Sequence, residues 1–274
     1  MTSVMSRQLP TRPISLGAAV PRISTARRVG PPVLVAVLGV LAWWATAIVL
    51  DSRIFPTPAD SMRSLVADLA TESFRANVFD SLRLLIAAFV VSVVMGSILG
   101  LALGMSAFWS RAVLPIIYSI NSIPKIVLYP LFLSFLGIGQ LSRFGFAFYA
   151  AFVPMLIMAV ESATAVNPLH LKMAASLRMS RPRLIRQIIV PSTLPALATG
   201  MRTTFGLAFL GLLLAEMFSS SSGIGYEMLR NVSLIRMENI MGTVVLIVVI
   251  ALPPTIALQA LENRITARFG GSAR

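Results

Sequence analysis

Few side chains in this sequence could carry out chemistry, and they do not form a familiar reactive group. The chain has no Cys and a single His, His170, so thiol-ligated metal sites, redox pairs and triads built on Cys or His lack their components. Its only lysines, Lys125 and Lys172, do not stand in the G-x-x-x-x-G-K-[ST] loop that cradles nucleotide phosphates. We therefore expect a protein that is not itself an enzyme and that carries no cofactor or metal.

The composition indicates that most of the chain is surrounded by lipid. Hydrophobic residues make up 57% of the 274 residues, charged residues only 12%, and the mean hydropathy is +0.85. A soluble domain is about 45–50% apolar and about 25% charged. The net charge of +13 could indicate nucleic-acid binding, but the arginines lie between apolar segments instead of gathering with aromatic residues on one polar face. Retention of basic residues on the cytoplasmic side of a membrane explains them better, and we expect no nucleic-acid partner.

The apolar segments predict an all-α, polytopic membrane protein. Six of them are long enough to cross about 30 Å of hydrocarbon, namely residues 33–50, 84–105, 113–136, 144–160, 200–218 and 240–258. If the N-terminus is inside, the inner segments hold 15 basic residues and the outer segments 7, so both termini are expected to be cytoplasmic. We assign residues 1–30 to a disordered basic tail, 31–265 to the transmembrane domain and 266–274 to a second cytoplasmic tail.

One predicted span has the features of a translocation path. Segment 113–136 holds three prolines, which remove backbone donors and kink helices, and it has Lys125 near its middle. A charge on a lipid-facing helix costs roughly 2.5–3.5 kcal/mol on insertion scales, so Lys125 should face protein or water. It either lines the path and favours an anionic solute, or makes a structural contact with a carboxylate such as Glu216 or with carbonyl groups near Pro124. The candidate path residues are Asn121, Lys125, Tyr129 and Glu216.

The longest inner segment, residues 161–199, has the pattern of two short amphipathic helices. Asn167 can cap the first helix and Pro168 can begin it. Ser180 can cap the second, which places apolar side chains on one face and arginines on another before Pro191 ends it. Such basic helices between two spans form a docking element for another protein. An interfacial loop attracted to anionic lipid is the alternative.

A column of small residues runs along the second predicted span. Its members are four residues apart and share one face of a helix: Ala88, Ser92, Gly96, Gly100 and Gly104. Because apolar burial gives little net drive for association inside a bilayer, such a column favours close approach of another helix. We expect this packing role in preference to a role in substrate binding.

A short helix is predicted after the first span. Thr57 can cap it, Pro58 can occupy its first position, and Asp60 places an acid in its first turn. From Met62 onward, apolar residues recur at i, i+3, i+4 and i+7. This pattern predicts a helix that lies in the outer membrane interface.

Residues 172–197, KMAASLRMSRPRLIRQIIVPSTLPAL, resemble the cytoplasmic "EAA" loop of the permeases of binding-protein-dependent ABC importers, E-A-A-x3-G-x9-I-x-L-P. The nitrate/sulfonate/taurine-type branch is the most similar. Other short segments match this branch in order: IFPTP at 54–58, SIPK at 122–125, LGIG at 136–139, GMR at 200–202, AEM at 215–217 and GIGY at 223–226. The resemblance covers about residues 50–264.

The resemblance implies a type I ABC importer permease fold in the bacterial inner (plasma) membrane. Its implied partners are a second permease subunit, ATP-binding cassette ATPase subunits and an extracytoplasmic solute-binding protein. In that family the loop seats in a groove of the ATPase and carries the ATP-driven motion to the spans. The positions that correspond here to this coupling role are Lys172, Met173, Ala174, Arg178, Ile188 and Pro191.

Three of these positions depart from the family pattern. Lys172 stands where Glu is usual, Met173 where Ala is usual, and Arg178 where Gly is usual. The chain is therefore expected to pair either with a second, more typical permease or with an ATPase whose groove has changed to match.

A secondary transporter is the main alternative, because such proteins relay protons or ions through intramembrane acids. Only Glu161 and Glu216 lie within or at the edge of the predicted spans, and no inverted repeat is visible, which favours the ABC permease. A membrane-embedded enzyme is less favoured still, for lack of paired carboxylates or of a nucleophile with a base. Specificity in the family rests largely on the binding protein, so this sequence does not predict the solute.

Overall fold

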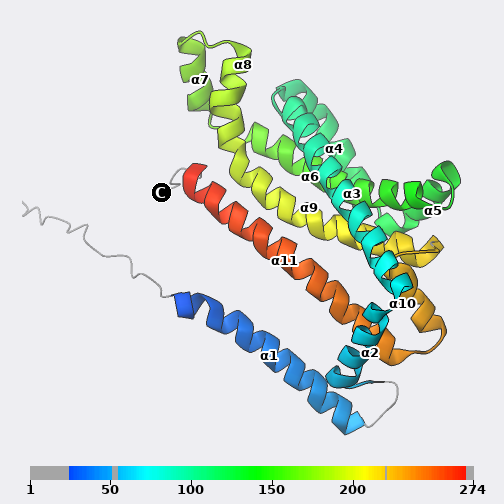
Figure 1. The fold of residues 1–274 in the computed structure, drawn as a ribbon. Helices are drawn as coiled ribbons and strands as arrows, with labels where there is room; N and C mark the ends of the chain where they lie inside the picture. The colour runs from blue at the N-terminus through cyan, green and yellow to red at the C-terminus, as the bar shows by residue number, and fades with distance from the viewer. Residues whose placement is uncertain (1–24, 51–54, 220, 270–274) are drawn as a thin grey trace, which may run out of the picture. The chain divides into compact units, whose positions relative to one another are not determined.

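A computed structural model describes residues 25–50, 55–219 and 221–269. Helices make up all of the regular structure in these residues, which agrees with the predicted fold class. The chain divides into two compact units, Met1–Val49 and Leu50–Arg274. Figure 1 shows the order of the helices within each unit.

The described part of the first unit belongs to α1 (Thr25–Leu50). Its apolar stretch, Leu34–Leu50, coincides with the first predicted span but is shorter than the roughly 20 residues that usually cross a bilayer. The predicted tail 1–30 lies outside the described residues up to residue 24, and residues 25–30 form the first turns of α1.

The second unit begins with the predicted short helix, which is confirmed as α2 (Pro58–Ala70). The Thr57 hydroxyl accepts a hydrogen bond from the Asp60 N–H at 3.2 Å, and Pro58 occupies the first turn as expected. On its packed face, Leu65 is buried with Phe74 and Leu246 from two other helices. Met62 and Val66 stay exposed, so α2 presents a second apolar face outward.

The column of small residues forms a close helix–helix contact in the second unit. It lies on α3 (Glu72–Gly104), is buried throughout, and packs against α6 (Gln140–Thr164). A Cβ placed on Gly100 would stand 2.4 Å from the Ala159 Cβ, and one on Gly104 would stand 2.6 Å from the Ala163 Cβ. The predicted packing role is therefore confirmed, because no side chain larger than hydrogen fits at these positions without displacing α6.

The predicted span 113–136 is not one continuous helix. It consists of α4 (Ala107–Ser122) and α5 (Lys125–Leu136), which meet at an angle of 94°. The break falls at Ile123 and Pro124, which have extended backbone angles, whereas Pro115 and Pro130 lie inside helices. A residue before proline is biased toward extended conformation, and this places the break at Pro124.

The predicted stop at Pro191 is wrong. After α7 (Pro168–Ser176), the chain forms α8 (Arg181–Leu184), a π-helical turn η1 (Ile185–Ile189) and α9 (Val190–Ser219), which together run as one helix from Arg181 to Phe218. Proline lacks the N–H that an α-helix would use at this point. The wider π turn, in which the Val190 N–H donates to the Ile185 carbonyl, rearranges the preceding bonds and lets the helix continue.

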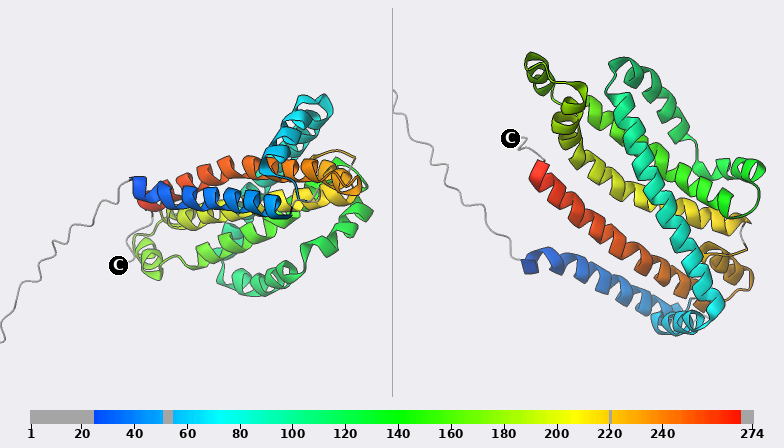
Figure 2. Two further views of the ribbon diagram at one scale, coloured as in Figure 1. Left: turned by 90° about the horizontal axis from the view of Figure 1, so that it is seen from below. Right: turned by 45° about the horizontal axis from the view of Figure 1, so that its top comes forward.

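The chain ends with α10 (Ile224–Ser233) and α11 (Met237–Phe269). Figure 2 shows α9 and α11 side by side, and the two helices are in contact. The main core cluster joins α3, α6 and α9 through residues such as Leu85, Ala147 and Leu212. In the described residues, the predicted tail 266–274 begins inside α11.

By length and composition, four helices of the described residues can cross a membrane: α3, α6, α11 and the run Arg181–Phe218. The bent α4–α5 pair makes a fifth if it counts as one span. Three of the four corresponding predicted spans lie within the long helices, and the fourth, 84–105, ends one residue after α3. Each helix extends beyond its predicted span at one or both ends. The extra turns carry polar residues, and several of these residues contribute to the site.

Candidate functional site

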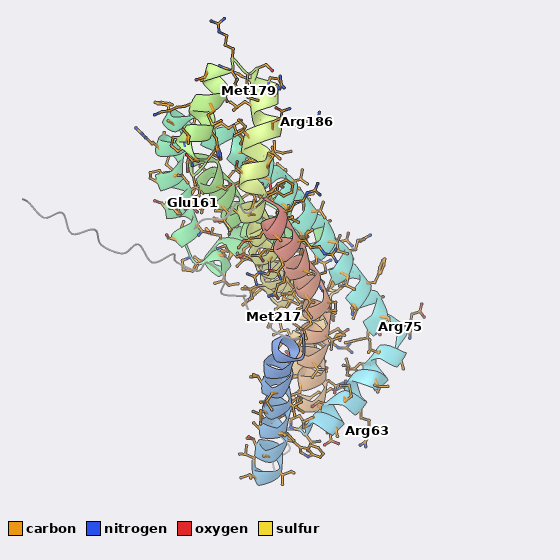
Figure 3. The ribbon with its side chains drawn as sticks, turned by 90° about the vertical axis from the view of Figure 1, so that its left-hand side faces the viewer. Arg63, Arg75, Glu161, Met179, Arg186 and Met217 are labelled. Carbon is orange, nitrogen blue, oxygen red and sulfur yellow. The ribbon has the colours of Figure 1, made fainter. Side chains whose placement is uncertain are left out.

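The coupling positions gather at one end of the second unit. In Figure 3, Met179 and Arg186 lie at this end, and Arg63 and Arg75 lie at the opposite end, which we call the far end. The Asn167 side chain accepts a hydrogen bond from the Leu169 N–H at 2.9 Å, so the predicted cap of the first short helix is confirmed.

Helix α7 has almost no partner within the described chain. Ala174 is its only buried residue, at 3% exposure, while Met173 is 55% exposed and Leu177 is 73% exposed. Lys172 is exposed as well. Ile188 lies in η1 and Pro191 at the start of α9, both half-buried. A helix with unpartnered apolar and basic side chains at the end of a bundle is suited to docking.

Arg178 occupies a left-handed backbone conformation just after α7. Its φ is +48°, and its N–H donates to the Ala175 carbonyl while the Met179 N–H donates to the Ala174 carbonyl. These are the two hydrogen bonds of a Schellman motif, in which the left-handed residue is most often Gly. The position where the family loop usually has Gly is thus a genuine glycine position that an arginine fills.

Two of the candidate path residues lie together at the break between α4 and α5. The Lys125 Nζ donates a hydrogen bond to the Asn121 Oδ1 at 3.3 Å, and Lys125 is half-buried. The structure shows no ion pair between Lys125 and a carboxylate within the described residues. The side chain therefore has an amide partner and part of its surface free.

The other two candidates are enclosed by protein. Tyr129 is 2% exposed, and its hydroxyl donates to the Ala215 carbonyl at 2.9 Å. Glu216 is fully buried next to this contact. Its carboxylate accepts hydrogen bonds from the Ser81 hydroxyl at 2.6 Å and from the Gly225 N–H at 2.9 Å. The structure thus ties Tyr129 of α5 to the residue that precedes Glu216 on α9, while Lys125, one turn before Tyr129 on α5, contacts Asn121.

A buried charge cluster at the far end escaped the sequence analysis. Arg143 is 4% exposed, and its Nη1 lies 3.2 Å from the Asp80 carboxylate and 3.9 Å from the Glu216 carboxylate. It also donates to the Ser222 carbonyl at 3.0 Å. Asp80 and Arg143 lie a few residues outside the predicted apolar windows. Asp80 precedes the predicted span 84–105 and Arg143 precedes the predicted span 144–160. Opposite charges at the starts of two spans could have indicated that these residues pair.

Glu161, the second acid near the predicted spans, lies away from this cluster at the other end of α6. The Tyr118 hydroxyl of α4 donates a hydrogen bond to its carboxylate. Since Glu161 and Glu216 hold separate partners on different helices, they do not form a relay of neighbouring acids. Among the described residues there is no group of three acidic or histidine side chains that could hold a metal ion.

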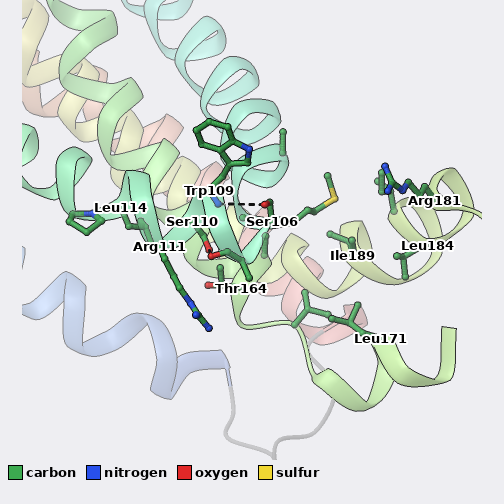
Figure 4. Close-up of a pocket in the computed structure, with 18 residues that line it drawn as sticks. Ser106, Trp109, Ser110, Arg111, Leu114, Thr164, Leu171, Arg181, Leu184 and Ile189 are labelled. Atoms are coloured by element: carbon green, nitrogen blue, oxygen red, sulfur yellow. Dashed lines mark hydrogen bonds between the residues drawn. The ribbon is translucent and has the colours of Figure 1, made fainter. Parts of the chain in front are cut away.

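A cleft of about 1260 Å³ opens beside α7, α8 and η1, which together we call the coupling segment. Figure 4 shows Ser106, Trp109 and Ser110 on one side and Leu171, Leu184 and Ile189 on the other. The walls come from the turn between α3 and α4, the end of α6, and the segment from α7 to η1. This space separates the coupling segment from α4.

Taken together, the fold and the site define a multi-pass membrane protein with one projecting, basic helical segment and a broken span that carries a half-buried lysine. The description of the matching family is "binding-protein-dependent transport system inner membrane component", and its match extends over residues 92–270. The chain belongs to this family. It is an inner-membrane permease subunit of an ABC transport system, as the resemblance of its loop implied.

Several relatives are permeases of the expected branch. The taurine transport system permease protein TauC of Escherichia coli (strain K12) is 25% identical over 83% of this chain and 86% of its own length. The putative aliphatic sulfonates transport permease protein SsuC of Bacillus subtilis (strain 168) is 23% identical over 86% and 84%. The nitrate import permease protein NrtB of Synechococcus elongatus is 25% identical over 67% and 70%.

A solved structure of the MetNI methionine ABC transporter, in an inward-facing conformation, contains a chain with the same fold. It aligns with a TM-score of 0.58 at 16% identity and covers 71% of this chain and 94% of that chain. The likeness supports the predicted type I permease fold. A secondary transporter is not favoured by these relationships.

Proposed function

We propose that this chain, together with a second permease subunit, forms the path of an importer for a small anionic solute. Separate ATPase subunits drive it, and an extracytoplasmic binding protein supplies the solute. In this arrangement segment 161–199 and both termini face the cytoplasm. The transmembrane domain is residues 31–265, and the two cytoplasmic tails are residues 1–30 and 266–274. The observation that carries this proposal is α7, which projects from the bundle with apolar and basic side chains that have no partner in the described chain.

Contact with the ATPase rests on the exposed residues of α7 and its continuation. Lys172, Met173 and Arg178 would face the ATPase groove, while Ala174 packs inward against the segment itself. Ile188 and Pro191 lie on the helix that continues into α9, so a displacement of α7 and α8 can reach the spans. Lys172 and Arg178 give this contact positive charge, and the matching ATPase groove is expected to be acidic.

Cross-linking tests the docking. The chain has no native Cys, so single cysteines at Met173 or Leu177 can be paired with cysteines in the ATPase groove without background. We expect disulfides from these two positions and none from the control Met62→Cys, which is 48% exposed, close to the 55% of Met173, but lies on α2 at the far end. An intact complex in which no α7 position cross-links would contradict the docking.

The path is proposed to pass the break between α4 and α5. Lys125 and Asn121 have accessible polar groups there, and Tyr129 and Glu216 support the wall from behind. The names of the relatives include taurine, aliphatic sulfonates and nitrate. A half-buried ammonium group suits such anionic solutes, because it attracts the charge more strongly than it would in bulk water.

The role of Lys125 is testable by two substitutions. Lys125→Met removes the charge but keeps most of the volume, and Lys125→Arg keeps the charge. In assembled complexes we expect the Met variant to import the anionic solute at least about tenfold more slowly and the Arg variant to retain most of the rate. Wild-type import by the Met variant would show that Lys125 has only a structural role.

A further inference from the structure

Glu216 occupies an unusual place, because its carboxylate is the meeting point of three segments. It lies on α9, accepts the Ser81 hydroxyl of α3 at 2.6 Å, and accepts the Gly225 N–H of α10 at 2.9 Å. Arg143 of α6 is 3.9 Å away. A fully buried carboxylate without such partners would be strongly disfavoured, so breaking these contacts while Glu216 stays buried carries a high cost.

The N-terminus of α10 depends on these partners. The first N–H groups of a helix have no partner within the helix, and no side chain of α10 itself caps them. Instead, the Gly223 N–H donates to Asn77 at 3.1 Å and the Ile224 N–H donates to Ser81 at 2.8 Å. With the bond from Gly225 to Glu216, three consecutive N–H groups are held by α3 and α9. The negative carboxylate also suits the positive end of the helix dipole.

The backbone is pressed directly onto the carboxylate. Gly223 has φ +108°, and a Cβ there would stand 2.4 Å from the Glu216 Cδ. A Cβ on Gly225 would stand 2.5 Å from the Leu213 carbonyl oxygen. Both positions therefore require Gly, for conformational freedom or for space. Because a Cβ on either glycine would collide with α9, the segment 223–225 lies directly against that helix.

Helix α9 reaches from this contact to the coupling segment. The helical run Arg181–Phe218 has 38 residues without a break, although it contains the π turn. From Val190 to Glu216 it spans about 39 Å at 1.5 Å per residue. Figure 1 shows α8 at one end of α9 and α10 at the other. A rigid element thus has the proposed ATPase contact at one end and the buried carboxylate at the other.

We propose that Glu216 is a positioning residue that makes the 221–225 segment and α10 move with α9. ATP-driven displacement of the coupling segment then changes the far end of the path. This inference rests on the proposed function and adds a mechanical link to it. In this role Glu216 does not touch the solute. It determines whether the motion of α9 reaches the far end.

The test compares solute transported per ATP hydrolysed in complexes reconstituted in liposomes with the ATPase and binding protein. Glu216→Gln keeps the shape but removes the negative charge and replaces one of the two accepting oxygens with an NH2 group, which cannot accept a hydrogen bond. We expect transport to fall at least about tenfold while ATP hydrolysis stays within about twofold, as the loss of hydrogen bonds to a charged group predicts. Ser81→Ala removes only the bridging hydroxyl, and we expect a loss of about threefold.

Glu262→Gln is the matched control. Glu262 also joins another helix to α9, because it lies 3.2 Å from the Arg202 Nε, but it does so toward the coupling end. We expect its transport per ATP to remain within about twofold of the wild type. Unchanged transport per ATP in Glu216→Gln would overturn the inference. If Glu216→Gln does not assemble, unchanged transport per ATP in Ser81→Ala would overturn the inference.

A distance measurement supplies an independent readout. Spin labels on the exposed residues Leu210 of α9 and Leu229 of α10 should keep one distance with and without ATP in the wild type. In Glu216→Gln we expect a broader distribution. A wild-type distance that changes with ATP would overturn the link. If the wild-type complex itself shows no ATP-dependent transport, the proposed function fails, and this outcome differs from every outcome that concerns Glu216.

Discussion

The two ends of the α9 helical run are built in opposite ways. At the coupling end, α7 has one buried residue, its larger apolar side chains are exposed, and the left-handed Arg178 follows it. At the far end, Arg143, Asp80 and Glu216 are packed between four helices with nearly every polar atom in a hydrogen bond. An exposed segment can be seated by another protein, whereas a buried charge cluster has one low-energy arrangement. The far end is therefore fixed by contacts within the chain, whereas in the proposed function the coupling end is fixed by its partner.

The largest effect is expected from breaking the buried cluster. Arg143→Met leaves the Glu216 carboxylate without its cation and the Asp80 carboxylate with only the half-exposed Arg83, and removal of one partner of a buried pair costs about 3–5 kcal/mol. We expect a clear loss in the free energy of unfolding, measured by thermal unfolding in detergent. Arg83→Met is the control, because Arg83 lies 3.1 Å from the same Asp80 but its side chain is 55% exposed.

For this control we expect a loss under about 1 kcal/mol, as is typical for surface ion pairs. Equal losses in the two variants would show that the cluster at the far end is solvated, and that the contrast between the two ends is not one of burial.

A smaller effect is expected from the α3–α6 contact. Gly100→Ala places a Cβ 2.4 Å from the Ala159 Cβ and 2.7 Å from the Leu156 carbonyl oxygen, and such overpacking costs roughly 1–3 kcal/mol. Gly100→Leu should disrupt assembly further. The matched control is Gly206→Ala on α9, where a Cβ meets nothing within 4 Å.

Because Ala favours helix over Gly by about 1 kcal/mol, the Gly206→Ala control should be neutral or slightly stabilising. The measurement is again the unfolding midpoint in detergent, combined with assembly of the complex. If Gly100→Ala were as stable as the control, α3 and α6 would have to move apart easily, and the bundle would be less rigid than its close packing indicates.

The smallest effect is expected at the coupling end and has the opposite sign. Arg178→Gly relieves a left-handed conformation that costs a non-glycine residue about 1 kcal/mol, so the segment after α7 should become more stable. Amide hydrogen exchange at Met179, whose N–H closes the Schellman motif, measures this locally. Leu177→Gly, at φ −80°, should instead lower protection.

If Arg178→Gly also weakens ATPase binding, contacts between Arg178 and the ATPase offset the cost of its left-handed conformation. The sequence at the coupling end would then be explained by docking. Unchanged or lower protection at Met179 would show that the turn is not strained.

Sequence patterns identified the features that depend on neighbouring residues. The caps at Thr57 and Asn167, the helix α2 and the glycine column are local or periodic, and the structure confirms each of them. The sequence also predicted that the spans are α-helices, because a chain that crosses hydrocarbon must satisfy its backbone hydrogen bonds within itself. Their ends were not, since polar turns such as those with Asp80 and Arg143 are stable only when another helix supplies the opposite charge.

The tertiary structure alone decided how prolines and charges are accommodated. The α4–α5 pair bends by 94° at Pro124, while at Pro191 a π turn lets the helix continue, so the same residue type has two outcomes that the sequence does not distinguish. The sequence determined a polytopic, basic permease with a loop that resembles the coupling loop of its family. That Glu216 has Ser81, Gly225 and Arg143 as its partners follows only from the fold, because a buried carboxylate takes its partners from whichever helices the packing brings within hydrogen-bond distance.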